Sequence, residues 1–125
     1  MKKIINTDKA PKPIGPYNQA VMSNNTLYVS GQIPLDPTTN EVVKGDIKNH
    51  TRQVMENLKA ILDEAGLDFS HVVKCSIYVS NMKNFSLINE IYGGYFKEDP
   101  PARETIEVAG LPMGVDVEIS CVAVI

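Results

Sequence analysis

The last eleven residues, VDVEISCVAVI (115–125), alternate strictly, and this pattern constrains the fold more than any other segment. Every odd position is apolar, whereas the even positions begin with Asp116, Glu118 and Ser120 and end with Val122 and Val124. Because successive side chains of a strand point to opposite faces of its sheet, the alternation predicts a long strand with one face in the core. The other face is polar at one end and apolar at the other, which is typical neither of a wet surface nor of a core.

The remaining elements follow from periodicity and turn chemistry. We expect strands at 27–33 (paired with 19–22 across a turn at 23–25), 72–80 and 103–108, and helices at 46–65 and 84–96. Asp46 and Gly66 are the expected caps of the first helix. In the second, Gly93-Gly94 predicts either a close backbone approach or a frayed end. The order β-β-α-β-α-β-β indicates a single α+β domain over 1–125, with both helices on one face of a sheet.

Alternation also assigns side chains to faces. Val73, Cys75, Ile77 and Val79 are expected to face the helices, as are Ile106 and Val108. The opposite face then carries Tyr28, Ser30, Tyr78, Arg103, Thr105, Glu118, Val122 and Val124. That set is too polar for the core of a monomer, and its apolar members Val122 and Val124 are unfavourable in contact with water. It therefore predicts a homo-oligomer in which such faces meet around a small-ligand pocket.

Charge and composition exclude several classes of protein. Twelve basic residues against fifteen acidic ones give a net charge of −3, which disfavours nucleic-acid binding and a polybasic membrane surface. The sequence has no apolar stretch near the ~20 residues of a membrane span or the ~7–15 of an export signal, so we expect a cytoplasmic protein. Cys75 and Cys121 have no CxxC or histidine partner at metal spacing. We therefore expect buried structural thiols and no bound metal.

Two arginines offer a planar, permanently charged fork. Arg103 follows two prolines, and it is consistent either with a grip on a ligand carboxylate or with a structural ion pair. Arg52 is expected on a solvated helix surface. Glu118, in mid-strand, is either a base that orients water or half of a salt bridge between subunits.

Other side chains could line a ligand pocket. They are Tyr17 in the turn Ile14-Gly15-Pro16-Tyr17, Ser30 and Gly31 at a strand end, and Asn89 on the second helix. Each also has a structural interpretation, as a loop anchor, a flexible strand end or a surface amide. No serine–histidine–acid set and no phosphate-binding glycine loop is present.

Several short motifs occur in a fixed order along the chain. They are Ile14-Gly15-Pro16-Tyr17, Ser30-Gly31-Gln32-Ile33-Pro34, Pro101-Ala102-Arg103, Val108-Ala109-x-Leu111-Pro112 and Val117-Glu118-Ile119. Each is weak alone, but the ordered set is specific. By these motifs the chain resembles the Rid family of reactive intermediate deaminases, RidA subgroup, over essentially its whole length.

The resemblance implies a chorismate-mutase-like fold in a homotrimer. Three sheets would form a central barrel with the helices outside, and the active sites would lie in clefts between subunits. The implied reaction is hydrolysis of 2-imino acids, such as 2-iminobutanoate and 2-iminopropanoate, to 2-keto acids and ammonia. Pyridoxal-phosphate enzymes such as threonine dehydratase would supply these substrates, and the resemblance implies no metal or organic cofactor.

The resemblance also implies roles for individual residues. Arg103 would grip the substrate carboxylate and Glu118 would orient the attacking water, while Tyr17, Ser30, Gly31 and Asn89 would line the pocket. Thr105 stands in the substrate site where many members have a cysteine, and the loop before Pro101 is shorter than in several relatives. Two other classes remain open: a non-catalytic sensor of keto or amino acids, and an RNA-acting ribonuclease or translation inhibitor.

Overall fold

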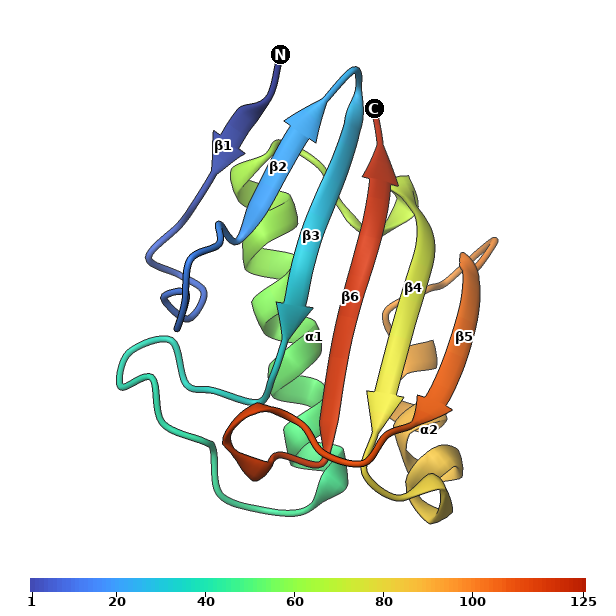
Figure 1. Cartoon of the computed structure of the whole chain (residues 1–125). Helices are drawn as coiled ribbons and strands as arrows, with labels where there is room; N and C mark the ends of the chain where they lie inside the picture. The colour runs from blue at the N-terminus through green and yellow to red at the C-terminus, as the bar shows by residue number, and fades with distance from the viewer.

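A computed structural model describes all 125 residues as one six-stranded sheet with two α-helices behind it (Figure 1). The elements are β1 (Lys3–Ile5), β2 (Ala20–Ser23), β3 (Thr26–Gln32), α1 (Ile47–Glu64), β4 (Val72–Val79), α2 (Phe85–Gly93), β5 (Ala102–Glu107) and β6 (Val117–Val124). Short 3₁₀ turns cover Phe69–His71, Met82–Asn84 and Pro112–Gly114. The strand order is β1-β2-β3-β6-β4-β5, with β4 and β5 parallel and all other neighbours antiparallel. The expected α+β class and the placement of both helices on one face are confirmed. None of the helices is both long and apolar enough to cross a membrane.

The predicted hairpin between β2 and β3 is confirmed. Ser23 pairs with Thr26, so the turn has two residues, and both Asn24 and Asn25 have positive φ. This backbone suits the twist of a two-residue hairpin, and asparagine tolerates it well. Sequence analysis missed β1, which pairs with β2, because three residues are too few to show a periodicity.

The caps predicted for α1 are also confirmed. The Asp46 carboxylate accepts a hydrogen bond from the Asn49 amide at 3.1 Å. At the other end Gly66 has a φ of +76°, and its amide donates to the Asp63 carbonyl, while the Leu67 amide donates to the Leu62 carbonyl. These two bonds form a Schellman motif, which needs a residue that adopts positive φ at little cost.

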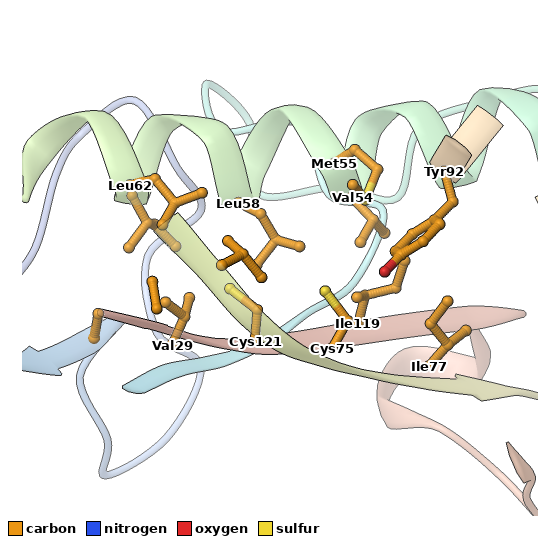
Figure 2. Packing of buried hydrophobic residues seen from close by; sticks show 14 of the residues in the cluster. Val29, Val54, Met55, Leu58, Leu62, Cys75, Ile77, Tyr92, Ile119 and Cys121 are labelled. Atoms are coloured by element: carbon orange, nitrogen blue, oxygen red, sulfur yellow. The ribbon is translucent and has the colours of Figure 1, made fainter. Parts of the chain in front are cut away.

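The main core lies between α1 and the central strands (Figure 2). Leu58 and Leu62 of α1 and Ile119 of β6 are fully buried there. The alternation of β6 holds, since the side chains at 117, 119, 121 and 123 are buried and those between them are partly exposed. Cys75 and Cys121 are buried, free and directly opposite one another in the β4–β6 register. Burial raises the pKa of both thiols, as expected of structural cysteines.

Two expectations about the middle of the chain are wrong in detail. A bulge between Val72 and Lys74 shifts the β4 register, so Val72 is buried and Val73 is 45% exposed. The second helix ends at Gly93 rather than at residue 96. A Cβ at Gly93 would meet no atom within 4 Å, and one at Gly94 would lie 3.4 Å from the Ile91 carbonyl oxygen of the same helix, so the pair marks the helix end and not a close approach to another element.

The faces assigned to β5 are wrong. Parallel pairing places Arg103 beside Cys75 and Thr105 beside Ile77, so both side chains lie on the helix side of the sheet. Ile106 points to the other side and is 44% exposed. The reason is that β5 is an edge strand covered by α2, whose facing side chains include an amide and aromatic rings, and these accept a long cation.

Candidate functional site

Four of the predicted site residues line one cavity on the sheet face that the helices leave uncovered. Its volume is about 310 Å³. It is lined by Ile14, Tyr17, Ser30, Gly31, Ile33, Pro112 and Glu118. We call it the glutamate cavity. Sequence analysis did not assign Ile14, Ile33 and Pro112 to it, although all three belong to the motifs that carried the resemblance.

A local irregularity in the sheet opens this cavity. The β3–β6 register shifts between Val29 and Gln32, which places Ser30 and Gly31 in a bulge. Bulges redirect side chains and are common beside functional sites. The Glu118 side chain crosses onto β3 over Gly31, so closely that a Cβ at Gly31 would lie 2.8 Å from the Glu118 carboxyl carbon. The absence of a side chain at Gly31 therefore leaves the space that the Glu118 carboxylate occupies.

Glu118 is partly withdrawn from water and has no hydrogen-bond partner within the chain. Desolvation raises the pKa of its carboxyl group above the usual glutamate value. A carboxylate with a raised pKa accepts a proton more readily at neutral pH, as a general base must. Two residues earlier, Asp116 anchors the start of β6, because both its carboxylate oxygens lie 2.9 Å from Nδ1 of His50 on α1.

Tyr17 and Ser30 are held in place at the rim of the glutamate cavity. The Ile14 amide donates to the Tyr17 hydroxyl oxygen at 3.2 Å, which folds the ring back over its own turn. The Tyr17 hydroxyl proton stays free to donate to a ligand. Ser30 Oγ donates to the Asn18 carbonyl at 2.6 Å, so its lone pairs remain available as acceptors.

The other predicted residues form a second group, which we call the arginine site: Arg103 and Thr105 of β5 and Asn89 of α2. Arg103 is half-buried, and one of its terminal nitrogens donates to Asn89 Oδ1 at 2.7 Å. No carboxylate of the chain forms an ion pair with Arg103, which excludes a structural ion pair within the chain. The Thr105 hydroxyl is buried and has no partner in the protein. By contrast, Arg52 lies on the exposed surface of α1 and contacts Asn49.

One copy of the chain does not bring the two groups together. On β4, the partner of Arg103 is Cys75 and the partner of Glu118 is Tyr78, three residues further along. Arg103 and Glu118 also lie on opposite faces and on strands with β4 between them. Strand geometry puts their backbones about 14 Å apart, which is far longer than a four-carbon acid.

Comparison with known proteins covers the whole chain. The profile of a family described as "Endoribonuclease L-PSP" matches residues 7–125. A RutC family protein from Pyrococcus horikoshii is 52% identical over 98% of both chains. The 2-iminobutanoate/2-iminopropanoate deaminase of Mus musculus is 45% identical over 99% of this chain and 92% of its own.

Solved structures agree with the fold described above. The crystal structure of a putative endoribonuclease from Thermotoga maritima superposes with a TM-score of 0.97, at 49% identity over 100% of this chain and 98% of that one. The structure of E. coli TdcF with bound serine superposes with a TM-score of 0.94, at 39% identity over 98% of both chains.

Proposed function

The chain belongs to the Rid/RutC (L-PSP) family, and we propose that it is a hydrolytic deaminase of small 2-imino acids such as 2-iminobutanoate and 2-iminopropanoate. The products are the 2-keto acid and ammonia. The named activity of the Mus musculus and Homo sapiens relatives, at 45% and 43% identity, supports this assignment.

One observation carries the proposal: Arg103 is a half-buried cation with no acidic partner in its own chain. A desolvated guanidinium without a counter-charge favours an anion, and its planar edge fits a carboxylate through two parallel hydrogen bonds. Asn89 occupies one donor, which leaves further N–H groups for the substrate. Every 2-imino acid carries the carboxylate that this site requires.

Glu118 supplies the proton transfers in the proposed reaction. The oxygen of a water molecule attacks C2 of the imine while the Glu118 carboxylate accepts a proton from that water. Glu118 returns this proton to the nitrogen, which gives an intermediate with a hydroxyl and an amino group on C2. Glu118 then accepts the hydroxyl proton and passes it to the amino group, so that the C=O bond forms as the C–N bond breaks and ammonia leaves. The raised pKa of Glu118 suits both steps, because the group takes up and returns one proton.

We further propose that the active site forms between copies of the chain in a homotrimer. Arg103 and Glu118 are too far apart in one copy to hold the same small acid, so neighbouring subunits must supply them. The uncovered sheet face, where Tyr28 and Val124 are 54% and 36% exposed, is the surface that a neighbouring copy would cover.

A coupled assay tests the activity. Threonine dehydratase generates 2-iminobutanoate beside semicarbazide, and the rate of semicarbazone formation is measured with and without this protein. We expect the rate to fall as wild-type protein is added, because less imine survives to be trapped. Arg103→Ala should abolish this effect and Arg52→Ala should retain it, since Arg52 is the other arginine and lies on the surface. An active Arg103→Ala protein would refute the role of Arg103.

A sensor of amino or keto acids is the second candidate, because the related TdcF structure contains bound serine. A sensor would use the same carboxylate grip without turnover. Semicarbazone formation distinguishes the two functions. A sensor leaves it unchanged, although 2-oxobutanoate or serine stabilises the protein against heat. A deaminase lowers semicarbazone formation.

The description of the matching family also names an endoribonuclease activity. The net charge of −3 weighs against it here, because RNA binding depends on cationic surfaces that neutralise phosphate. Incubation with labelled single-stranded RNA discriminates the two activities. We expect intact RNA, and cleavage that survives in Glu118→Gln and Arg103→Ala would indicate a separate site.

A further inference from the structure

The side of α2 that faces β5 carries three residues at helical spacing: Phe85, Asn89 and Tyr92. Positions i, i+4 and i+7 lie on one face of a helix, so these side chains form a row. All three contact the guanidinium of Arg103. Its carbon lies 5.5 Å from the Phe85 ring centroid and 5.1 Å from the Tyr92 ring centroid. Asn89, between the rings, accepts the hydrogen bond of 2.7 Å described above.

The spacing of this row lets two aromatic rings contact one guanidinium. Seven residues of α-helix rise about 10.5 Å, so the two rings leave the helix at points about that far apart along its axis. The guanidinium carbon lies at similar distances from both ring centroids. Aromatic faces attract the cation without using its N–H groups, because the attraction comes from the ring quadrupole. Asn89 uses one N–H, so the remaining donors stay free in the plane of the fork.

The chemistry of the row leaves the arginine charge uncompensated. A carboxylate at position 85, 89 or 92 would hold Arg103 more tightly, but it would also compete with an incoming carboxylate. The Tyr92 ring stays neutral, because burial and the neighbouring Cys75 thiol raise the pKa of its hydroxyl. That hydroxyl is buried and points toward the sheet (Figure 2). It forms no hydrogen bond, although the Cys75 thiol is nearby. The ring of Tyr92 therefore contacts Arg103 while the hydroxyl has no partner.

We propose that Phe85, Asn89 and Tyr92 are positioning residues that hold the plane of the Arg103 guanidinium ready for the substrate carboxylate. This inference rests on the proposed function and gives Asn89 a different task from lining the pocket: it orients the arginine. Because the row acts through Arg103 on binding, its loss should raise KM and leave kcat largely unchanged.

Phe85→Leu is the main test, because Phe85 is 38% exposed and its truncation spares the core. We expect KM for 2-iminobutanoate to rise about three- to ten-fold, as the loss of a partly desolvated cation–π contact predicts, with kcat within about two-fold of wild type. Phe85→Tyr should restore the wild-type KM, because it keeps the aromatic face. Leu87→Ala removes another exposed apolar side chain of α2 on the opposite side of the helix, and should leave KM unchanged.

Tyr92 gives a second, matched pair. Tyr92→Phe removes a hydroxyl that has no partner, so KM should stay at the wild-type value. Tyr92→Leu removes the ring and should raise KM, with a loss of stability because the side chain is buried. If Tyr92→Phe raises KM as much as Tyr92→Leu does, the hydroxyl, and not the ring, acts on Arg103.

A spectroscopic signature separates this inference from the proposed function. The chain has two arginines, so the ¹H–¹⁵N spectrum of the protein has two Nε–H resonances, and Arg103→Lys identifies that of Arg103. Ring currents should shift the Arg103 resonance away from that of exposed Arg52, and Phe85→Leu should move it back while Leu87→Ala does not. If wild-type protein neither hydrolyses 2-iminobutanoate nor binds 2-oxobutanoate, the proposed function fails and this shift alone decides the positioning role. If Phe85→Leu changes neither KM nor the resonance, the positioning role is overturned.

Discussion

Glu118 places a carboxylate where water is partly excluded, and this has opposite effects on stability and catalysis. Its pKa is raised, so the folded protein binds the Glu118 proton more tightly than the unfolded chain does. The stabilisation from this proton is complete below the unfolded value of 4.5 and disappears as the pH rises through the folded value. At neutral pH the ionised side chain therefore opposes folding.

Glu118→Gln should show both effects. We expect its melting temperature at pH 7 to exceed that of wild type by a few degrees, and the difference to vanish near pH 4. Its kcat should fall by about 100- to 10,000-fold, because the amide cannot accept the proton of water. Thermal melts from pH 4 to 8 and the coupled assay give the two quantities. A variant less stable than wild type at pH 7 would show that the carboxylate is stabilised by a partner.

Gly31 should matter for activity rather than for stability. A Cβ there would lie 2.8 Å from the Glu118 carboxyl carbon and closer still to one oxygen, so Gly31→Ala must displace the carboxylate. The end of a flexible side chain moves cheaply, and we expect a nearly unchanged melting temperature. A displacement of about 1 Å predicts a loss of kcat of about 100-fold. Gly110→Ala is the matched control, since a Cβ at Gly110 meets nothing within 4 Å. Wild-type kcat in Gly31→Ala would show that Glu118 needs no fixed place.

Among the elements, alanine substitution of the two glycines at the helix ends should change the free energy of unfolding in opposite directions. Gly66 has a φ of +76° in the Schellman motif of α1, so Gly66→Ala should lower the free energy of unfolding by about 1 kcal/mol. Gly93 ends α2 with helical backbone and open space around it, so Gly93→Ala should raise the free energy of unfolding by up to about 1 kcal/mol. Urea denaturation measures both. Equal effects of the two substitutions would mean that backbone conformation does not govern these positions.

The elements also show why the sequence predicts some features and not others. The apolar stripe of α1 and the alternation of β6 could be recognised in the sequence because each element packs one face against the main core. In β5 the same reasoning put Ile106 inside and Arg103 outside, and the structure has the reverse. The edge strand β5 is covered only by the short helix α2. The side chains of α2 therefore decide which face of β5 turns toward the helix. Arg103 could have been placed only by considering α2 and β5 together, since the row at 85, 89 and 92 suits a cation.

At the scale of the whole molecule, the separation of Arg103 and Glu118 decides what one copy can do alone. Sequence analysis put both on one sheet face, and that would have allowed a complete site in a single chain. The structure puts them on opposite faces, with β4 between their strands. Strand periodicity could not reveal this, because it fixes which residues share a face within a strand and not how strands relate. An active site that uses both residues must therefore combine two copies.

Mixing two inactive variants tests this arrangement. Arg103→Ala retains Glu118, and Glu118→Ala retains Arg103, so an interface between the two variants can restore one complete site. If equal amounts are unfolded together and refolded, random assembly makes about a quarter of all sites complete, and activity should recover to about a quarter of wild type. Refolding each variant alone controls for residual activity and should give none. If both residues serve a site within one chain, no subunit in the mixture carries both, and the mixture stays inactive. The recovered fraction therefore reports directly whether neighbouring copies share the site.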